Sequence, residues 1–164
     1  MYIQIRKAAI IDITFIQKIA AITWGNTYTF LPDGQMEYML ELIYSNKSLQ
    51  EQMEDGHQFY VAIIEENIIG FASVSKQKES NVFKLNKLYV SPKTQKTGAG
   101  KALLQSVITY AKENNGTEIQ LQVNRNNNAK DFYLKKGFII LYEADFEIGN
   151  GFFMNDYVMS FNII

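Results

Sequence analysis

The chain of 164 residues contains no cysteine, only two prolines and a single histidine, His57. The absence of cysteine excludes disulfide bonds, thiolate zinc sites and a cysteine nucleophile, and one histidine excludes a histidine-rich metal cluster. A strong charge of either sign is also missing, because 16 basic residues oppose 17 acidic ones. This balance argues against a nucleic-acid-binding module. No apolar run approaches the ~20 residues that a membrane-spanning helix needs.

What remains is typical of one globular domain. Hydrophobic residues make up 47% of the chain, and a chain of this length can bury a substantial core without metals or disulfides. Residues 2–6 alternate like a strand and lack the charged and apolar regions of a signal peptide. We therefore expect a single domain over residues 1–164, located in the cytoplasm.

Hydrophobic periodicity predicts the element order β-α-α-β-β-β-α-β-α-β-β. Apolar residues recur every three or four positions in the expected helices and alternate in the expected strands. Helices are expected after Asp12 and Asp33, both as N-caps, after Gly100 and over residues 129–136. The expected strands cover residues 2–6, 58–64, 68–75, 82–90, 119–123, 138–148 and 152–161. This order predicts an α+β fold, in which a mixed, mostly antiparallel sheet of six to seven strands is flanked by about four helices.

One expected strand, residues 82–90, has a break in its apolar alternation. Phe83 and Leu85 occupy positions of one parity, whereas residues 88 and 90 occupy the other. A slip of one residue predicts a β-bulge near Asn86 and Lys87. Because bulges are frequent beside active sites, this strand is a candidate for the functional site.

A segment with two glycines, residues 95–100, connects this strand to a strongly periodic helix. Glycines at a helix start let a ligand approach the backbone, where free N–H groups favour an anion such as phosphate. A Walker A loop is excluded, because Gln95 stands at its first glycine and Ala102 at its Ser or Thr. A dinucleotide-binding loop is also excluded, because Leu103 stands at its third glycine.

A third type of phosphate-binding loop fits the sequence. Residues 95–100 (Q-x-x-G-x-G) resemble the Gln/Arg-x-x-Gly-x-Gly/Ala loop of the GNAT superfamily of N-acetyltransferases. Residues 126–138 (N-x-x-A-x-x-F-Y-x-x-x-G-F) are similar to a second element of that family, at the expected distance downstream. The order of elements also matches along nearly the whole chain. The resemblance implies the GNAT fold and binding of acetyl-CoA as a cosubstrate, with no metal.

Carried over position by position, the resemblance implies roles for individual residues. Leu88 and Val90 would offer backbone groups to the pantetheine arm, and Asn126 would contact the pantetheine or phosphate region. Tyr133 would stand near the thioester sulfur as the general acid that protonates the leaving thiol. The pyrophosphate would be held by the loop and the start of the helix, namely Gln95, Lys96, Thr97, Gly98, Ala99, Gly100 and Lys101.

The sequence does not identify a general base. Many members of the family place a glutamate on the bulged strand, but residues 85–87 contain no carboxylate. Asn86 can hold a water molecule but is not a useful proton acceptor. His57 titrates in a suitable range, yet it lies in a loop beside Gly56 and is not assigned.

The acceptor site would lie between the first two helices and the last hairpin, as the resemblance implies. Aromatic side chains there can wall a pocket for a cation, and acidic stripes occur at helical and at strand spacing. The candidate residues are Trp24, Tyr28, Tyr38, Glu37 and Glu143. A polyamine acceptor would suit these carboxylates. The alternative, that the stripes are solvated faces and the aromatics belong to the core, stays open.

The leading hypothesis is direct transfer of an acetyl group from acetyl-CoA to a primary amine of a small molecule. The alternatives are acetylation of a protein N-terminus or lysine, and a non-catalytic CoA-binding sensor or interaction domain. The missing glutamate favours the sensor, whereas Tyr133 opposes it. The leading hypothesis includes no nucleic-acid or membrane partner, and the resemblance allows a homodimer.

Overall fold

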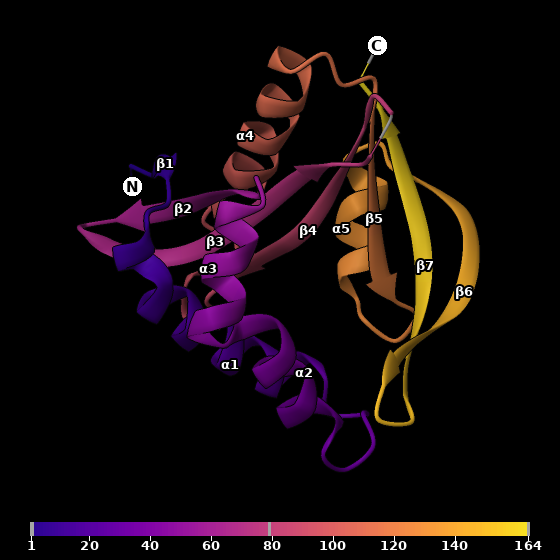
Figure 1. The fold of residues 1–164 in the computed structure, drawn as a ribbon. Coiled ribbons are helices and arrows are strands. Elements are labelled where there is room, and N and C mark those ends of the chain that lie inside the picture. Colours follow the sequence, from indigo (N-terminus) through magenta and orange to yellow (C-terminus); the bar gives the residue numbers. More distant parts are fainter. Residues whose placement is uncertain (1, 79, 164) are drawn as a thin grey trace.

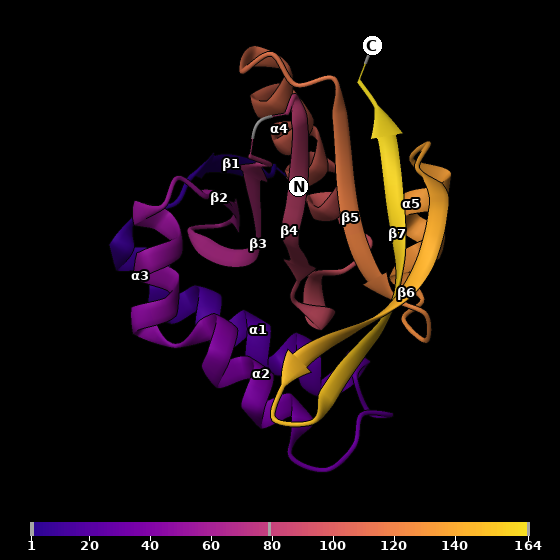
Figure 2. The same ribbon diagram turned by 45° about the vertical axis from the view of Figure 1, so that its right-hand side comes forward.

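The computed structural model describes residues 2–78 and 80–163, and these form a seven-stranded sheet with the order β1-β2-β3-β4-β5-β7-β6 (Figures 1 and 2). Neighbouring strands are antiparallel except β4 and β5, which are parallel. The strands are β1 (Gln4–Lys7), β2 (Gln58–Ile64), β3 (Asn67–Lys76), β4 (Val82–Val90), β5 (Glu118–Asn124), β6 (Ile139–Gly149) and β7 (Phe152–Asn162). The α+β class and the mostly antiparallel sheet are confirmed.

Five α-helices cover the two faces of this sheet in the described residues. They are α1 (Ile13–Thr27), α2 (Gln35–Tyr44), α3 (Asn46–Glu54), α4 (Ala99–Glu113) and α5 (Ala129–Lys135). One helix more than expected forms because Ser45 ends α2 and caps α3, where its side chain accepts a hydrogen bond from the Ser48 N–H. No helix in the described part of the chain is long and apolar enough to cross a membrane.

Of the two predicted aspartate caps, the position of Asp12 is confirmed and Asp33 is wrong. Asp12 is the N-cap residue of α1, but its side chain makes no cap hydrogen bond to that helix. Its carboxylate instead accepts two hydrogen bonds from the Arg6 guanidinium, at 2.8 and 2.9 Å, and these lower the pKa of Asp12. Asp33 does not cap α2, because that helix begins after Gly34, whose φ of +83° a glycine adopts without strain.

The core consists of two apolar clusters, one on each face of the sheet. The first lies beneath α4 and includes the fully buried Phe83 and Leu103. The second lies beneath α1, α2 and α3 and includes Ile16 and Phe71. Because strand side chains alternate between faces, β2, β3 and β4 each contribute to both clusters. Figures 1 and 2 show α1, α2 and α3 grouped together, apart from α4 and α5.

The predicted bulge lies in β4. Ser73 of β3 pairs with Lys87, and the next residue, Val74, pairs with Leu85, so Asn86 is the extra residue. β4 pairs with β5 only over residues 82–84 opposite residues 118–120. Figure 2 shows the two strands diverging beyond this point. Since a bulge bends its strand and increases the local twist, the bulge at Asn86 contributes to this opening of the sheet.

Gly116, which follows α4, occupies a position where no side chain fits. A Cβ atom there would lie 2.7 Å from the carbonyl oxygen of Ala111 and 2.7 Å from the ring of Phe83. Gly116→Ala is therefore expected to lower the free energy of unfolding by about 1–3 kcal/mol, as overpacking does. Urea unfolding measures this loss.

The matched control is Gly25→Ala in α1. A Cβ atom at Gly25 would have no atom within 4 Å, and alanine is the better helix former by about 1 kcal/mol. This variant should be as stable as the original chain or more stable. Equal losses of stability in both variants would contradict the packing described for Gly116.

Candidate functional site

A cavity of about 750 Å³ lies where β4 and β5 diverge. Its walls come from the end of α1, residues 85–90 of β4, the loop before α4, the middle of β5 and α5. The volume is within the range of roughly 300–1,000 Å³ that is usual for small-molecule sites. The opening between two strands therefore provides the main candidate site of the described residues.

The loop over residues 95–101 forms part of the cavity wall. Gly98 has a φ of +92°, which directs the chain into α4 in a conformation that favours glycine. Gly100 lies in the first turn of α4, and the space that a Cβ atom would take there faces Val90 and Phe132. The backbone N–H groups at the start of α4 are therefore accessible to an anion, with no side chain between.

Thr97 and two lysines complete this loop. The Thr97 hydroxyl donates to the Thr94 carbonyl at 2.7 Å and accepts a long hydrogen bond of 3.4 Å from the Ala99 N–H. Thr97 itself does not line the cavity, whereas Lys96 and Lys101 do. The loop thus combines free N–H groups with positive charge, which is the chemistry that binds a pyrophosphate.

The bulged strand provides a second binding element. β4 is paired with β3 along one edge, where Ala72 faces Leu88 and Gly70 faces Val90. Beyond residue 84 its other edge has no strand partner in the described residues. Free backbone groups on such an edge can hydrogen-bond an extended ligand in the manner of an added strand. A phosphate cradle beside a free strand edge fits a long molecule such as acetyl-CoA.

Tyr133 of α5 also lines the cavity, although it is only 7% exposed. Its ring packs against Phe132 and Phe138, with centroids 5.2 and 5.5 Å away. Its hydroxyl makes no hydrogen bond to another described residue, and burial raises the pKa of Tyr133. The phenol therefore remains protonated at neutral pH and can donate a proton.

The aromatic residues near α1 occupy different positions. Tyr28 lines the cavity, and its hydroxyl is hydrogen-bonded to that of Tyr89 and accepts a hydrogen bond from the Asn127 amide at 3.4 Å. Trp24 is buried behind Tyr28, with ring centroids 4.9 Å apart, and does not line the cavity. Tyr38 lies elsewhere and donates to the Ile148 carbonyl at 3.0 Å. Tyr38 therefore fixes α2 to the β6–β7 hairpin.

The two carboxylates expected at the acceptor site lie at the surface. Glu37 is exposed on α2 and Glu143 is exposed on β6, and neither lines the cavity. Asp145, on the same stripe as Glu143, forms an ion pair with Arg125 at 2.6 Å. Among the described residues that line the cavity there is no Asp or Glu, and the charged ones are Lys87, Lys96, Lys101 and Lys136.

Lys87, beside the bulge, is a feature that sequence reasoning did not single out. It is 7% exposed, and its Nζ atom donates to Gln52 Oε1 at 2.6 Å and lies over the rings of Tyr44 and Phe59. Burial, followed by the charge of the neighbouring lysine at position 84, lowers the pKa of Lys87 to about 7. His57 lies outside the cavity lining, and burial and the charge of Lys87 lower its pKa.

The structure thus gathers most of the predicted site. Nine of the ten residues expected to bind the cosubstrate line one cavity together with Tyr133 and Tyr28, and Thr97 supports the loop from behind. Trp24, Tyr38, Glu37 and Glu143 are not among the lining residues. Lys87 is an unpredicted member, and the only signal for it was the break in alternation at the bulge.

Comparison with known proteins is consistent with this geometry. Residues 30–161 match the model of the acetyltransferase (GNAT) domain family. An uncharacterised N-acetyltransferase of Mycobacterium tuberculosis is 37% identical over 93 residues. The match covers 56% of this chain and 58% of the mycobacterial protein, so this chain spans less than two thirds of that relative.

Two proteins of Thermoplasma acidophilum match over a greater length. A spermidine N(1)-acetyltransferase is 28% identical over 145 residues, which are 84% of this chain and 89% of the relative. The crystal structure of the PaiA N-acetyltransferase in complex with coenzyme A superposes with a TM-score of 0.83 and 26% identity, over 99% of each chain. The fold is therefore shared with a protein that binds coenzyme A.

The cavity assignment predicts that Gly98→Leu weakens binding of coenzyme A at least tenfold, measured by calorimetry. A side chain at this left-handed position strains the loop that presents its N–H groups. Gly56→Leu is the control, because Gly56 has the same φ of +92° but lies outside the cavity. Both variants should lose similar stability. Unchanged affinity in Gly98→Leu, or an equal loss in Gly56→Leu, would remove the loop from the binding site.

Proposed function

The chain belongs to the GNAT acetyltransferase family, and from this we propose that it transfers an acetyl group from acetyl-CoA to a primary amine. The observation that carries the proposal is the shared cavity of the residue 95–101 loop, the free edge of β4 and Tyr133. These elements supply an anion cradle, a backbone edge and a proton donor. The combination matches what a thioester with a long phosphorylated arm requires.

Each part of the cavity has a role in the proposed reaction. The loop and the start of α4 hold the pyrophosphate, and Leu88, Val90 and Asn126 contact the pantetheine arm. A backbone N–H of the bulged strand stabilises the negative charge that develops on the carbonyl oxygen. Tyr133 donates a proton to the departing thiolate, whose conjugate acid has a solution pKa of ~8.5. Protonation makes the thiol a better leaving group.

We propose a small cationic amine as the acceptor, with spermidine as the first candidate. Support comes from the Thermoplasma acidophilum relative that is named for spermidine and matches over most of its length. Tyr28 and Tyr89 line the cavity and offer aromatic walls for a cation. Acetylation of a protein N-terminus or lysine is the alternative that the same cosubstrate geometry allows.

A panel of amines tests the proposed function. Release of coenzyme A thiol is measured with spermidine, a lysine-containing peptide and a peptide with a free N-terminus as acceptors. We expect turnover above the rate without acceptor, and most with spermidine. Preference for a peptide would transfer the assignment to protein acetylation. No turnover with any amine, together with tight binding of coenzyme A, would favour the sensor domain instead.

The role of Tyr133 predicts that Tyr133→Phe lowers the single-turnover rate by ~10²–10⁴-fold, as loss of a positioned acid does. Affinity for coenzyme A should change little, because the ring and its packing remain. Single-turnover kinetics are required, since slow product release can hide part of the loss in kcat.

The control for this variant is Tyr110→Phe. Tyr110 lies on α4 against Phe83 and Tyr60, outside the cavity lining. The Tyr110→Phe variant should leave the single-turnover rate unchanged. A Tyr133→Phe variant with the original single-turnover rate would exclude Tyr133 from the mechanism, and one that does not fold would assign Tyr133 to the core.

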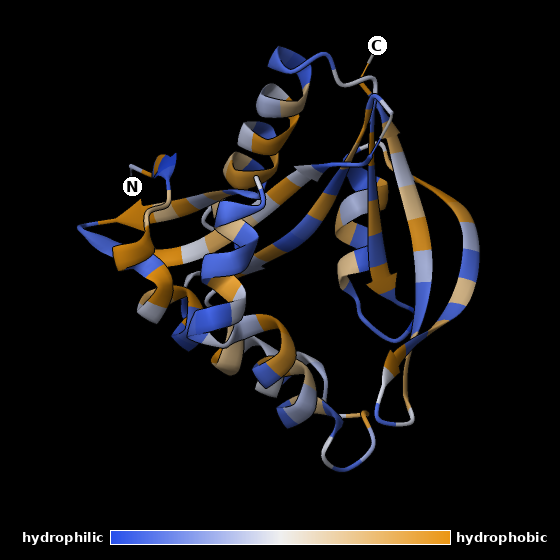
Figure 3. Ribbon diagram, in the orientation of Figure 1, coloured by the Kyte–Doolittle hydropathy of each residue, from blue (hydrophilic) through white to orange (hydrophobic). Residues whose placement is uncertain are grey.

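We also propose a homodimer formed through β6, the outer strand of the sheet. The consecutive residues Ile139, Ile140, Leu141 and Tyr142 are 41–61% exposed, and Figure 3 shows hydrophobic colouring along this part of β6. An outer strand with apolar side chains is suited to pairing with a second copy. A monomer in sedimentation velocity at micromolar concentrations would contradict this proposal.

A further inference from the structure

The face of the sheet opposite α4 and α5 carries one buried carboxylate. On β5 and β7, Val123, Tyr157 and Met159 belong to the cluster beneath α4 and α5. The strand alternation therefore places Asn124 and Asp156, which pair with each other, on the opposite face. Asp156 is 4% exposed and is the only charged residue of β7. β7 thus contributes a single charge to the face on which α1, α2 and α3 lie.

This carboxylate has an incomplete set of partners. Its Oδ1 atom is buried and makes no hydrogen bond to any described residue. No ion pair within 4.0 Å joins Asp156 to a described cation, and the nearby Arg125 is bound instead to Asp145. A buried carboxylate without a cation is unfavourable for stability. Such a group is therefore expected where a ligand supplies the missing partner.

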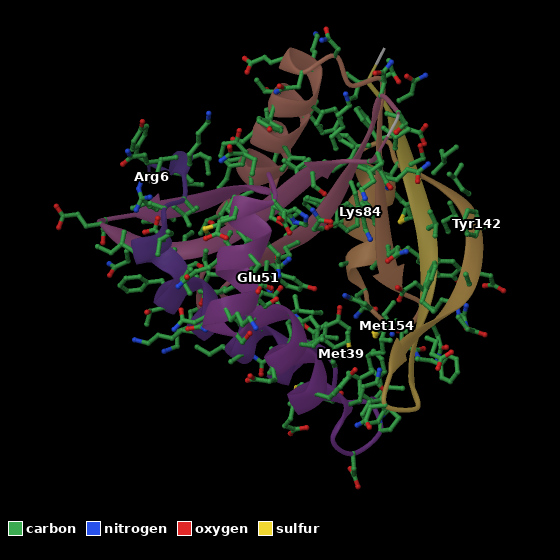
Figure 4. All side chains as sticks on the ribbon, viewed as in Figure 1. Arg6, Met39, Glu51, Lys84, Tyr142 and Met154 are labelled. Atoms are coloured by element: carbon green, nitrogen blue, oxygen red, sulfur yellow. The ribbon has the colours of Figure 1, made fainter. Side chains whose placement is uncertain are left out.

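Asp156 does not itself line the cavity, but residues next to it do. Tyr28, which lines the cavity, is close enough for the charge of Asp156 to raise its pKa, although burial has the larger effect on that pKa. Asn124, the residue of β5 that pairs with Asp156, accepts a hydrogen bond of 2.9 Å from the N–H of Asn126, which also lines the cavity. The charge of Lys84 lowers the pKa of Asp156, and the Lys84 Nζ atom lies 3.5 Å from Oε1 of Gln122, another lining residue. Figure 4 shows Lys84 near the centre of the molecule, well inside Tyr142 on the outer strand.

We infer that Asp156 is the catalytic base: its carboxylate binds the ammonium group of the acceptor and takes its proton. The inference rests on the proposed acetyl transfer to an amine. Asp156 fills the role of general base, for which the bulged strand β4 offers no carboxylate. It also assigns recognition of the cationic nitrogen to Asp156, rather than to the exposed Glu37 and Glu143.

The proposed step balances as follows in protons and electrons. The ammonium gives one proton to Asp156, and the neutral nitrogen uses its lone pair to bond the acetyl carbon. The carbon–sulfur bond breaks with its electron pair on sulfur, and the thiolate takes the hydroxyl proton of Tyr133. The surplus proton of the new amide nitrogen returns to the tyrosinate, and Asp156 releases its proton to solvent. The products are the N-acetyl amine, coenzyme A thiol and one proton.

The electrostatic setting suits this role. Burial raises the pKa of Asp156 to about 6, while the charges of Arg125 and Lys84 oppose this effect. Tyr28, which follows α1, is a neutral phenol near Asp156, and β6 places the uncharged Ala144 opposite Asp156. Asp156 is therefore ionised and able to accept a proton above pH 6, and it is protonated and inactive below that pH. A carboxylate of raised pKa is a stronger base than an exposed one.

Asp156→Asn tests the inference, because it keeps the shape of the side chain and removes the proton acceptor. With spermidine at pH 7, its single-turnover rate should be lower by ~10²-fold or more, with coenzyme A affinity within twofold of the original chain. The deficit should shrink at pH 9.5, where more of the acceptor is neutral in solution and needs no base. Asp131→Asn, an exposed aspartate on α5 outside the cavity lining, is the matched control and should not change the rate.

Lys84→Met provides an independent readout. Removing this cation raises the pKa of Asp156, so the acidic limb of the pH–rate profile should move to higher pH. A rate for Asp156→Asn within threefold of the original chain, or an equal deficit at pH 7 and pH 9.5, would overturn the inference while leaving amine acetylation intact. If the original chain transfers acetyl to no amine of the panel, the proposed function itself fails, and this inference fails with it.

Discussion

The site depends on the short pairing between β4 and β5. The two strands are hydrogen-bonded over three residue pairs and then separate, which leaves one edge of β4 without a strand partner. Had the pairing continued, β5 would occupy the edge of Leu88 and Val90 and close the cavity. The bulge at Asn86 bends β4 near the start of this separation. The α4 loop and α5 then place an anion cradle and a phenol on the walls of the resulting space.

The distribution of charge divides the site into two parts. Lysines 96, 101 and 136 line the cavity with no carboxylate beside them among the described residues, which suits a ligand that carries several phosphates. The opposite face of the sheet holds Asp156, buried and without an ion pair. These two regions complement the anionic cosubstrate and the cationic acceptor that we propose. Lys87, with a pKa lowered to about 7, is protonated only part of the time at neutral pH.

The sequence was sufficient for those features that depend on neighbouring residues. The loop, the N-x-x-A-x-x-F-Y element and the bulge each follow from local spacing, and the structure places all three at one cavity. The sequence did not predict which side chains are buried by elements that lie far away along the chain. Lys87 is buried because Gln52 of α3 and two rings cover it. Asp156 is turned away from α4 by the register of β5 and β7. Neither fact can be predicted from spacing within one segment, because such spacing does not show which surface another element covers. For this reason the acidic stripes at Glu37 and Glu143 did not indicate the lining of the cavity.

A crystal structure of the chain with coenzyme A tests the central claim most directly. We expect the pyrophosphate on the N–H groups of residues 98–101, the pantetheine arm along the free edge of β4, and the sulfur within hydrogen-bonding distance of the Tyr133 hydroxyl. Coenzyme A bound outside the opening between β4 and β5, or a sulfur directed away from Tyr133, would contradict the account.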